Sequence, residues 1–197
     1  IYTGSFDDDL NSSIAFDVDV YDNQLANIGD DGLEPEGACV NNRFWNNTVD
    51  TQWNGISLAP ITFGPVWVIG NRFTDFGAGG IKLSNNSSGR VWIYHNTCYT
   101  DRPDLNGMTV SGPFENIVMR NNLIRGTRYA FEMSIAADLN DFDYDNFYTT
   151  RGAPVIKWDN IRYDTMEDMC TAVGLECNGQ PLNPKLVNPA AGQYALS

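Results

Sequence analysis

The chain has 197 residues, 42% of them hydrophobic, and a formal net charge of −13. This length is enough for one domain with a sizeable core. Nucleic acid and anionic membranes bind basic surfaces, so the acidic charge argues against both as partners. No run of about 18 apolar residues predicts a membrane span. The charge instead favours an extracellular protein, or one that meets cations.

Residues 1–14 are polar and acidic, and we interpret them as a segment that leads into the rest of a single domain. The first run of alternating apolar residues follows at Ala15–Tyr21. A first strand leaves one edge of its sheet unpaired, so self-association through this N-terminal edge is expected unless other residues cover it.

One unit repeats through residues 15–160. Its clearest copy, 66–83, has apolar residues five and three positions before an Asn, and a second short run that opens on Gly. The aligned copies are 24 to 26 residues apart and place this Asn at Asn23, Asn47, Asn71, Asn96, Asn122 and Asn146. A fixed period in this range indicates a solenoid or an array. The sixth copy is irregular, because Phe142 and Tyr144 alternate one position out of phase.

The alternation has period two, which predicts strands. Two or three strands in each copy predict an all-β fold, a right-handed parallel β-helix (solenoid) of about six coils. A propeller would need four strands and a longer period per blade, and a leucine-rich repeat would place Leu at most inward positions. Coils lie about 4.8 Å apart, so the six Asn side chains are expected to bond one another as a ladder. Asn also tolerates the left-handed backbone of a sharp corner.

The most acidic stretch lies in the first coil and contains Asp30, Asp31, Glu34 and Glu36. Clustered carboxylates bind Ca²⁺, and the four residues are therefore candidate metal ligands. A pair of carboxylates can also act as acid and as base or nucleophile in glycoside hydrolysis. Because Asp-Asp-Gly is a common turn, a structural role is the alternative.

The second run of each coil places a polar column on the outside of the solenoid. Its charged members Glu34, Lys82 and Glu132 are candidate catalytic residues. The only histidine, His95, just before Asn96, is a further candidate for acid–base chemistry. The alternatives are a solvated sheet face with weak cross-strand pairs and a structural histidine at a corner. The whole column reads Glu34, Ser57, Lys82, Thr109, Glu132.

Aromatic residues occupy outward positions of the first run, and aromatic rings on a sheet stack against sugar rings. Two nearby arginines, Arg90 and Arg102, are candidates for holding an acidic group of the same ligand. Other parts of the chain or another subunit could equally cover this face, since so large a bare patch is unusual on a monomer. The candidate substrate-binding aromatics are Trp45, Trp67, Trp92 and Tyr94.

Residues 161–197 predict a short helix and a tail. Thr165 is a suitable N-cap with Asp168 three residues later, and Gly174 is a suitable C-terminal stop. This helix would cover the last coil and protect its edge.

The four cysteines differ in their expected state. Cys170 and Cys177 are close enough in sequence for a disulfide. Cys39 and Cys98 lie two coils apart, about 10 Å, which is too far for a disulfide and leaves two buried thiols. One disulfide favours a secreted, periplasmic or cell-surface location.

The segments Gly29–Glu34, Gly64–Asn71, Tyr94–Thr97 and Asn183–Pro189 resemble the right-handed parallel β-helix repeat-containing proteins of the pectate-lyase-like superfamily. The likeness covers about 15–197 and is to the C-terminal portion of such proteins. It implies a polysaccharide partner, because its members include polysaccharide lyases, glycoside hydrolases, tailspikes and non-enzymatic solenoids. In the lyases a Lys or Arg removes a proton, often beside Ca²⁺, which implies Lys82 as base with Arg90 or Arg102.

We therefore expect an extracellular protein that binds or processes a polysaccharide, as a lyase or a glycoside hydrolase if it is an enzyme. A non-catalytic, adhesin-type β-solenoid module is the alternative. Ca²⁺ is the only cofactor that the sequence predicts.

Overall fold

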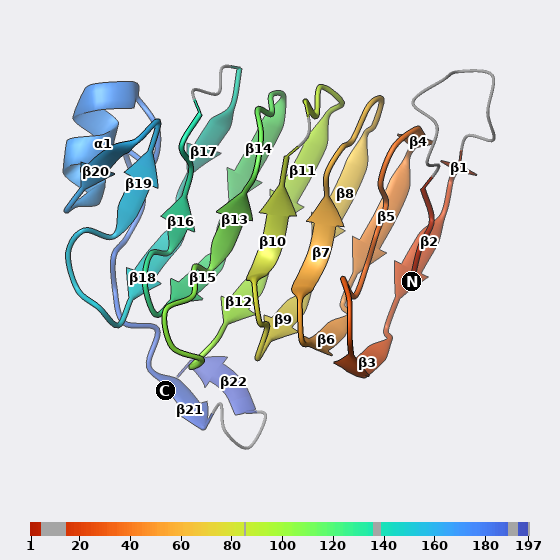
Figure 1. Ribbon diagram of the computed structural model, residues 1–197, viewed down its shortest axis with the longest axis horizontal. Helices are drawn as coiled ribbons and strands as arrows, with labels where there is room; N and C mark the ends of the chain where they lie inside the picture. The colour runs from red at the N-terminus through yellow and green to blue at the C-terminus, as the bar shows by residue number, and fades with distance from the viewer. Residues whose placement is uncertain (5–14, 85, 136–138, 189–192, 197) are drawn as a thin grey trace.

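The computed structural model describes residues 1–4, 15–84, 86–135, 139–188 and 193–196. It confirms a parallel β-solenoid of about six coils that ends in one short helix. Figure 1 shows the coils side by side along the long axis, with the N-terminal coil at one end and the helix at the other. Most of the N-terminal segment predicted at 1–14 lies outside the described residues.

The coils form three sheets, which we number in the order in which a coil reaches them. The first coil joins the third sheet only through an isolated bridge between Leu33 and Ile56. The first sheet contains β2 (Asp19–Tyr21), β5 (Asn42–Trp45), β8 (Val66–Ile69), β11 (Val91–Tyr94), β14 (Ile117–Arg120) and β17 (Asp141–Asp143). The second contains β3 (Gln24–Ile28), β6 (Thr48–Thr51), β9 (Arg72–Thr74), β12 (Thr97–Tyr99), β15 (Leu123–Gly126) and β18 (Asn146–Thr149). The third contains β7 (Asn54–Leu58), β10 (Gly79–Leu83), β13 (Met108–Val110), β16 (Phe131–Glu132), β19 (Ile156–Trp158) and the antiparallel β20 (Ile161–Tyr163).

Two short sheets complete the described strands. β1 (Ala15–Phe16) pairs with β4 (Cys39–Val40), so the expected first run Ala15–Tyr21 divides into β1 and β2. β21 (Leu186–Asn188) and β22 (Gln193–Leu196) form an antiparallel hairpin within the predicted tail.

The core is made of inward columns that come from all three sheets. Val68, Phe73 and Ile81 come from the three strands of one coil and have no exposed surface. A Gly stands at the start of the third-sheet run in three coils, at Gly55, Gly80 and Gly107, because a side chain from the second sheet lies directly beneath it. A Cβ added at Gly80 would lie 2.6 Å from the Sγ atom of Cys98. The backbone therefore approaches the core more closely there than any other residue would allow.

The asparagine ladder follows the corner between the first and second sheets. The Nδ2 group of Asn71 donates to Oδ1 of Asn96 at 3.0 Å, and that of Asn47 donates to Oδ1 of Asn71 at 2.9 Å. The left-handed backbone expected of these Asn residues belongs instead to the residue before each of them, such as His95 with φ 56°. The ladder Asn itself is free to point inward.

The sixth ladder position is occupied by Asp145, and the prediction of Asn146 there was wrong. Oδ1 of Asp145 accepts from the backbone N–H of Asn122 at 2.6 Å and from its Nδ2 at 2.8 Å. Asn146 pairs in register with Leu123, one position after the ladder residue. The last coil is one residue shorter, which is the cause of the phase change at Phe142.

The C-terminal cap begins with α1 (Met166–Val173). Thr165 accepts from the backbone N–H of Asp168 at 3.1 Å, and Gly174 ends the helix in the left-handed conformation, as predicted. Met166 and Met169 are buried against the end of the core. Cys170 and Cys177 form the expected disulfide, with the two sulfurs 2.03 Å apart, and Cys39 and Cys98 are buried thiols.

Candidate functional site

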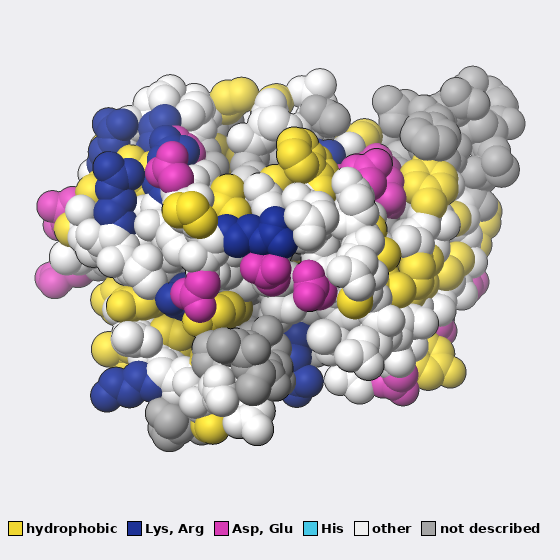
Figure 2. Space-filling view, turned by 60° about the horizontal axis from the view of Figure 1, so that its bottom comes forward, with side chains coloured by type: hydrophobic (Ala, Val, Ile, Leu, Met, Phe, Trp, Pro, Cys, Tyr) yellow, Lys and Arg dark blue, Asp and Glu magenta, His cyan; other side chains and the backbone are white. Residues whose placement is uncertain are grey.

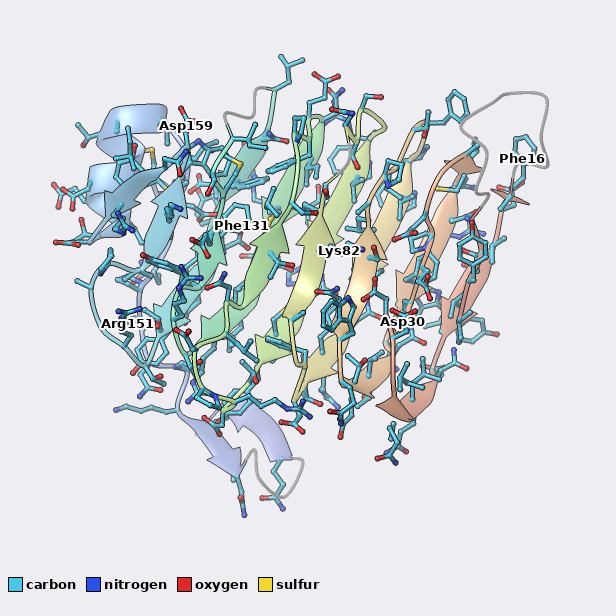
Figure 3. All side chains as sticks on the ribbon, viewed as in Figure 1. Phe16, Asp30, Lys82, Phe131, Arg151 and Asp159 are labelled. Atoms are coloured by element: carbon cyan, nitrogen blue, oxygen red, sulfur yellow. A yellow bond between two sulfur atoms is a disulfide. The ribbon has the colours of Figure 1, made fainter. Side chains whose placement is uncertain are left out.

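The outward column of the third sheet has the register that the sequence predicts. Ser57, Lys82, Thr109 and Glu132 are successive partners on adjacent strands. Glu34 stands one coil earlier, since its neighbour Leu33 bridges to Ile56. Figure 3 places Lys82 over β10, in the middle of this face. Figure 2 shows basic and acidic side chains close together on it.

Lys82 lies between two carboxylates of the acidic stretch. Its Nζ atom is 3.3 Å from Oδ2 of Asp31 and 3.8 Å from Oε1 of Glu36. These two distances place the two carboxylate oxygens no more than about 7 Å apart, an upper limit that admits the carboxyl separation of retaining glycoside hydrolases. We name Asp31, Glu36, Lys82 and the neighbouring Ser57 the Lys82 cluster.

The two carboxylates of the Lys82 cluster have different environments. Asp31 is 6% exposed, and its Oδ1 accepts from the backbone N–H and the side-chain amide of Asn54 at 3.0 and 2.7 Å. Glu36 accepts from the hydroxyl of Ser57. Burial raises the pKa of Glu36, although the Ser57 hydrogen bond and the charge of Lys82 oppose this. The Asp31 carboxylate is thus held by three donors, counting Lys82, while the Glu36 carboxylate has an increased affinity for a proton.

The remaining acidic residues are less closely engaged. Burial, and next the charge of Glu36, raises the pKa of Glu34. Asp30 is exposed, and its carboxylate accepts from the backbone N–H of Asp31 in a turn. The part of the chain that the structure describes holds no group of three or more Asp, Glu, His or Cys side chains placed for a metal ion. Calcium binding by Asp30, Asp31, Glu34 and Glu36 stays a prediction.

Glu132 lies at the other end of the same face and is fully paired. It contacts Arg128 at 2.6 Å and Lys157 at 3.2 Å, and it accepts from the side-chain amide of Asn106 at 2.9 Å. These donors lower the pKa of Glu132 against the opposing effect of its burial, which is the largest single influence. A carboxylate held ionised by three donors is suited to structural pairing.

The aromatic residues of the first sheet stack on one another. The ring centroids of Tyr21 and Trp45 are 4.3 Å apart at 4°, and those of Trp67 and Trp92 are 5.4 Å apart at 13°. Parallel rings this close contact each other face to face. The rings are therefore stacked along the solenoid axis and stand upright on the sheet instead of lying flat on it. Tyr94 packs at a tilt against Trp92.

The other predicted residues lie on different parts of the surface. The guanidinium of Arg90 lies 5.4 Å from the ring centroid of Trp92 on the first sheet. Arg102 binds both carboxylate oxygens of Asp75, at 2.8 and 3.0 Å. His95 is exposed at the corner between the first and second sheets. Neither these residues nor the aromatic rings belong to the Lys82 cluster, which faces outward from the third sheet.

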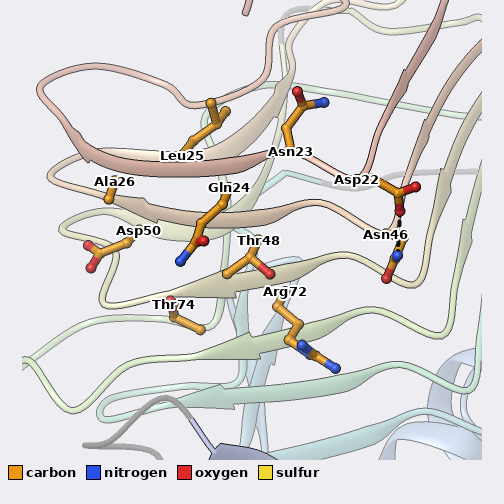
Figure 4. A pocket seen from close by; sticks show the side chains of 10 residues that line it. All are labelled: Asp22, Asn23, Gln24, Leu25, Ala26, Asn46, Thr48, Asp50, Arg72 and Thr74. Atoms are coloured by element: carbon orange, nitrogen blue, oxygen red, sulfur yellow. Dashed lines mark hydrogen bonds between the residues drawn. The ribbon is translucent and has the colours of Figure 1, made fainter.

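A groove on the second sheet was not predicted from the sequence. It has a volume of about 530 Å³ and lies over β3, β6 and β9, as Figure 4 shows. Five of its residues are consecutive, at 22–26, and the others come from the next two coils, about 24 and 48 positions later. Only the register of the strands could have indicated it. The lining residues are Asp22, Asn23, Gln24, Leu25, Ala26, Asn46, Thr48, Asp50, Arg72 and Thr74.

Comparison with known proteins gives no relative: no family model, curated protein or solved structure matches the chain. No helix within the described residues is long and apolar enough to cross a membrane. The fold therefore rests on the structure, and the function on the arrangement of its side chains.

Proposed function

We propose that the protein is an extracellular carbohydrate-processing β-helix that hydrolyses a glycosidic bond of a polysaccharide at the Lys82 cluster. The observation that carries this proposal is the position of Asp31 and Glu36 on either side of Lys82. Two carboxyl groups at this separation, one of them with a raised pKa, are what acid-assisted glycoside hydrolysis requires.

The environments of the two carboxylates suggest their roles. Glu36 has the raised pKa, so it is the general acid that protonates the leaving oxygen. Asp31 receives two hydrogen bonds from Asn54 and one ion pair from Lys82, which fix its carboxylate in place for the role of nucleophile or base. Lys82 lies close to both carboxylates and positions them.

Hydrolysis is better supported than a lyase reaction with Lys82 as the base. A base must be open to the proton that it removes, whereas the Nζ atom of Lys82 lies against the carboxylates of Asp31 and Glu36. The pectate-lyase-like resemblance and a calcium requirement remain predictions that the same assay addresses. The disulfide between Cys170 and Cys177 supports an extracellular location.

The test is a screen of neutral and acidic polysaccharides that measures both reducing ends and unsaturated products, with and without Ca²⁺. We expect new reducing ends from at least one polysaccharide, and Glu36→Gln and Asp31→Asn should each reduce the rate by about 100-fold or more. Glu167→Gln, an exposed carboxylate on α1, is the matched control and should leave the rate unchanged.

Three outcomes would contradict the proposal. Unsaturated products would indicate a lyase. Full activity in both variants would place the chemistry elsewhere. No activity on any polysaccharide would favour the non-catalytic solenoid, which the complete pairing of Glu132 with Arg128, Lys157 and Asn106 also suits.

A further inference from the structure

The groove of the second sheet contains an arginine, Arg72, that has no side-chain partner among the residues that the structure describes. The arginines on the parallel strands are Arg43, Arg72, Arg120 and Arg125. Within the described residues, Arg43, Arg120 and Arg125 each bind an aspartate at 2.6 to 2.7 Å. Arg72 alone among them has no carboxylate, hydroxyl or ring partner there. The guanidinium of Arg72 lines the groove.

The groove also contains a carboxylate that does not pair with Arg72. Asp50 and Arg72 lie on adjacent strands two positions apart in register, since Thr48 pairs with Arg72 and Asp50 with Thr74. Figure 4 shows the two side chains pointing away from each other. Burial, followed by the charge of Asp75, raises the pKa of Asp50. The groove thus presents one guanidinium and two carboxylates, and of the two carboxylates Asp22 is engaged by the side-chain amide of Asn46. Arg72 and Asp50 are separately available to a ligand.

The other lining groups suit a chain of hydroxyls. Gln24, Thr48 and Arg72 are successive partners across three strands, so an amide, a hydroxyl and a guanidinium follow one another about 4.8 Å apart. Leu25 and Ala26 add apolar surface against which the C–H face of a sugar can pack. The volume of about 530 Å³ is within the usual range for ligand sites.

We propose that this groove binds an oligosaccharide that carries an anionic group, either a carboxylate or a sulfate. Arg72 holds the anionic group with two parallel N–H donors. Thr48 and Gln24 bond the sugar hydroxyls, and Asp50 accepts from a hydroxyl at the far end of the groove. The groove lies on a different sheet from the Lys82 cluster, so this binding does not depend on the hydrolysis proposed above.

The experiment is a calorimetric titration of the whole chain with matched oligosaccharides that are carboxylated, sulfated or neutral. We expect the acidic oligosaccharides to bind, and the carboxylated and sulfated probes identify which anion is preferred. Arg72→Gln should weaken that binding by about tenfold or more, which is the usual effect of removing a charged hydrogen-bond pair. Because Arg72 has no partner in the described residues, the variant should fold and melt as the wild type does.

Two control variants separate this proposal from its alternatives. Arg151→Gln removes an exposed arginine near the opposite end of the solenoid and should leave the affinity unchanged, unless binding reflects only the overall charge. Glu167→Gln, which changes an exposed carboxylate on α1 outside both sites, should bind like the wild type. Equal binding of neutral and acidic oligosaccharides, unchanged affinity in Arg72→Gln, or no binding at all would overturn the proposal.

Discussion

A pair of buried carboxyl groups at the end of the asparagine ladder predicts an unusual dependence of stability on pH. Asp145 is 0% and Glu176 1% exposed. The backbone N–H of Asp145 donates to Oε2 of Glu176 at 3.2 Å, while Oδ2 of Asp145 and Oε1 of Glu176 have no hydrogen-bond partner within the described part of the chain. A proton on Glu176 would supply the missing donor between these two oxygens.

The sign of the effect follows from which state holds the proton. Burial raises the pKa of both groups, and the charge of Asp145 raises that of Glu176 further. The folded state therefore keeps a proton that the unfolded state releases near pH 4.5, the ordinary value for Glu176. This stabilisation is complete below pH 4.5 and is lost as the pH rises towards the shifted value. Each pH unit in that range corresponds to about 1.4 kcal/mol, so the loss from pH 4.5 to 7 is about 3 kcal/mol.

The variant Glu176→Gln isolates this effect, because its amide can donate to Asp145 and does not titrate. We expect the free energy of unfolding of the wild type, from urea titrations at fixed pH, to fall between pH 5 and 8. The Gln variant should show a much smaller slope and be the more stable protein at pH 8. Glu167→Gln on α1 is the exposed control. A wild-type stability that is level or rising over this range, or equal slopes in both proteins, would refute the reasoning.

The remaining predictions concern single residues whose contacts are specific, each measured by urea unfolding. Asn71→Ala removes four ladder hydrogen bonds in the core and should cost about 3 to 6 kcal/mol, whereas Asn23→Ala at the open end should cost only about 1 kcal/mol. Equal costs would mean that the ladder does not stabilise the interior. Gly80→Ala places a Cβ 2.6 Å from Sγ of Cys98 and should cost about 1 to 3 kcal/mol, so a neutral result would contradict the close approach. Thr165→Ala removes the N-cap bond of α1 and should cost about 1 kcal/mol, while Thr165→Ser should retain most of it.

The periodic part of this fold could be predicted because each coil repeats the same physical requirements. An inward Asn at a corner, apolar residues at alternate positions and a Gly over the core all recur at nearly constant spacing. The helix was predictable for a different reason, since Thr165 and Gly174 carry local capping signals that need no repeat.

The sixth ladder residue could not be placed by the same pattern. Asp145 and Asn146 are adjacent, and both side chains can accept a hydrogen bond from the Asn122 amide. The shifted phase of Phe142 was the only signal that the coil is one residue shorter. Register became certain only with the pairing of Met119 with Phe142. The partner of Asp145, Glu176, comes from the cap, outside the repeat, so the buried pair was beyond any periodic argument.

The candidate sites could be predicted only in part, and the reason is the geometry of a solenoid. Equivalent positions of successive coils lie about 4.8 Å apart, so residues in one column contact one another before they contact anything else. Trp67 therefore stacks on Trp92, and Glu132 is bound by Lys157 from the next coil. A column that looks functional in the sequence is often occupied by its own neighbours.

The same geometry indicates which charged residues point to a functional site. Where a column alternates in sign, its members neutralise one another and need no ligand. Arg72 follows Thr48 and Gln24 in its column, so no carboxylate reaches it from the preceding coils, and Thr97 follows it in the next. Its column leaves the guanidinium open to the groove. Lys82 instead receives Asp31 and Glu36 from a stretch that departs from regular strand pairing, which is why two carboxylates approach one lysine. In a regular solenoid, functional chemistry is therefore best sought where a charge has no partner in its column or receives one from outside it.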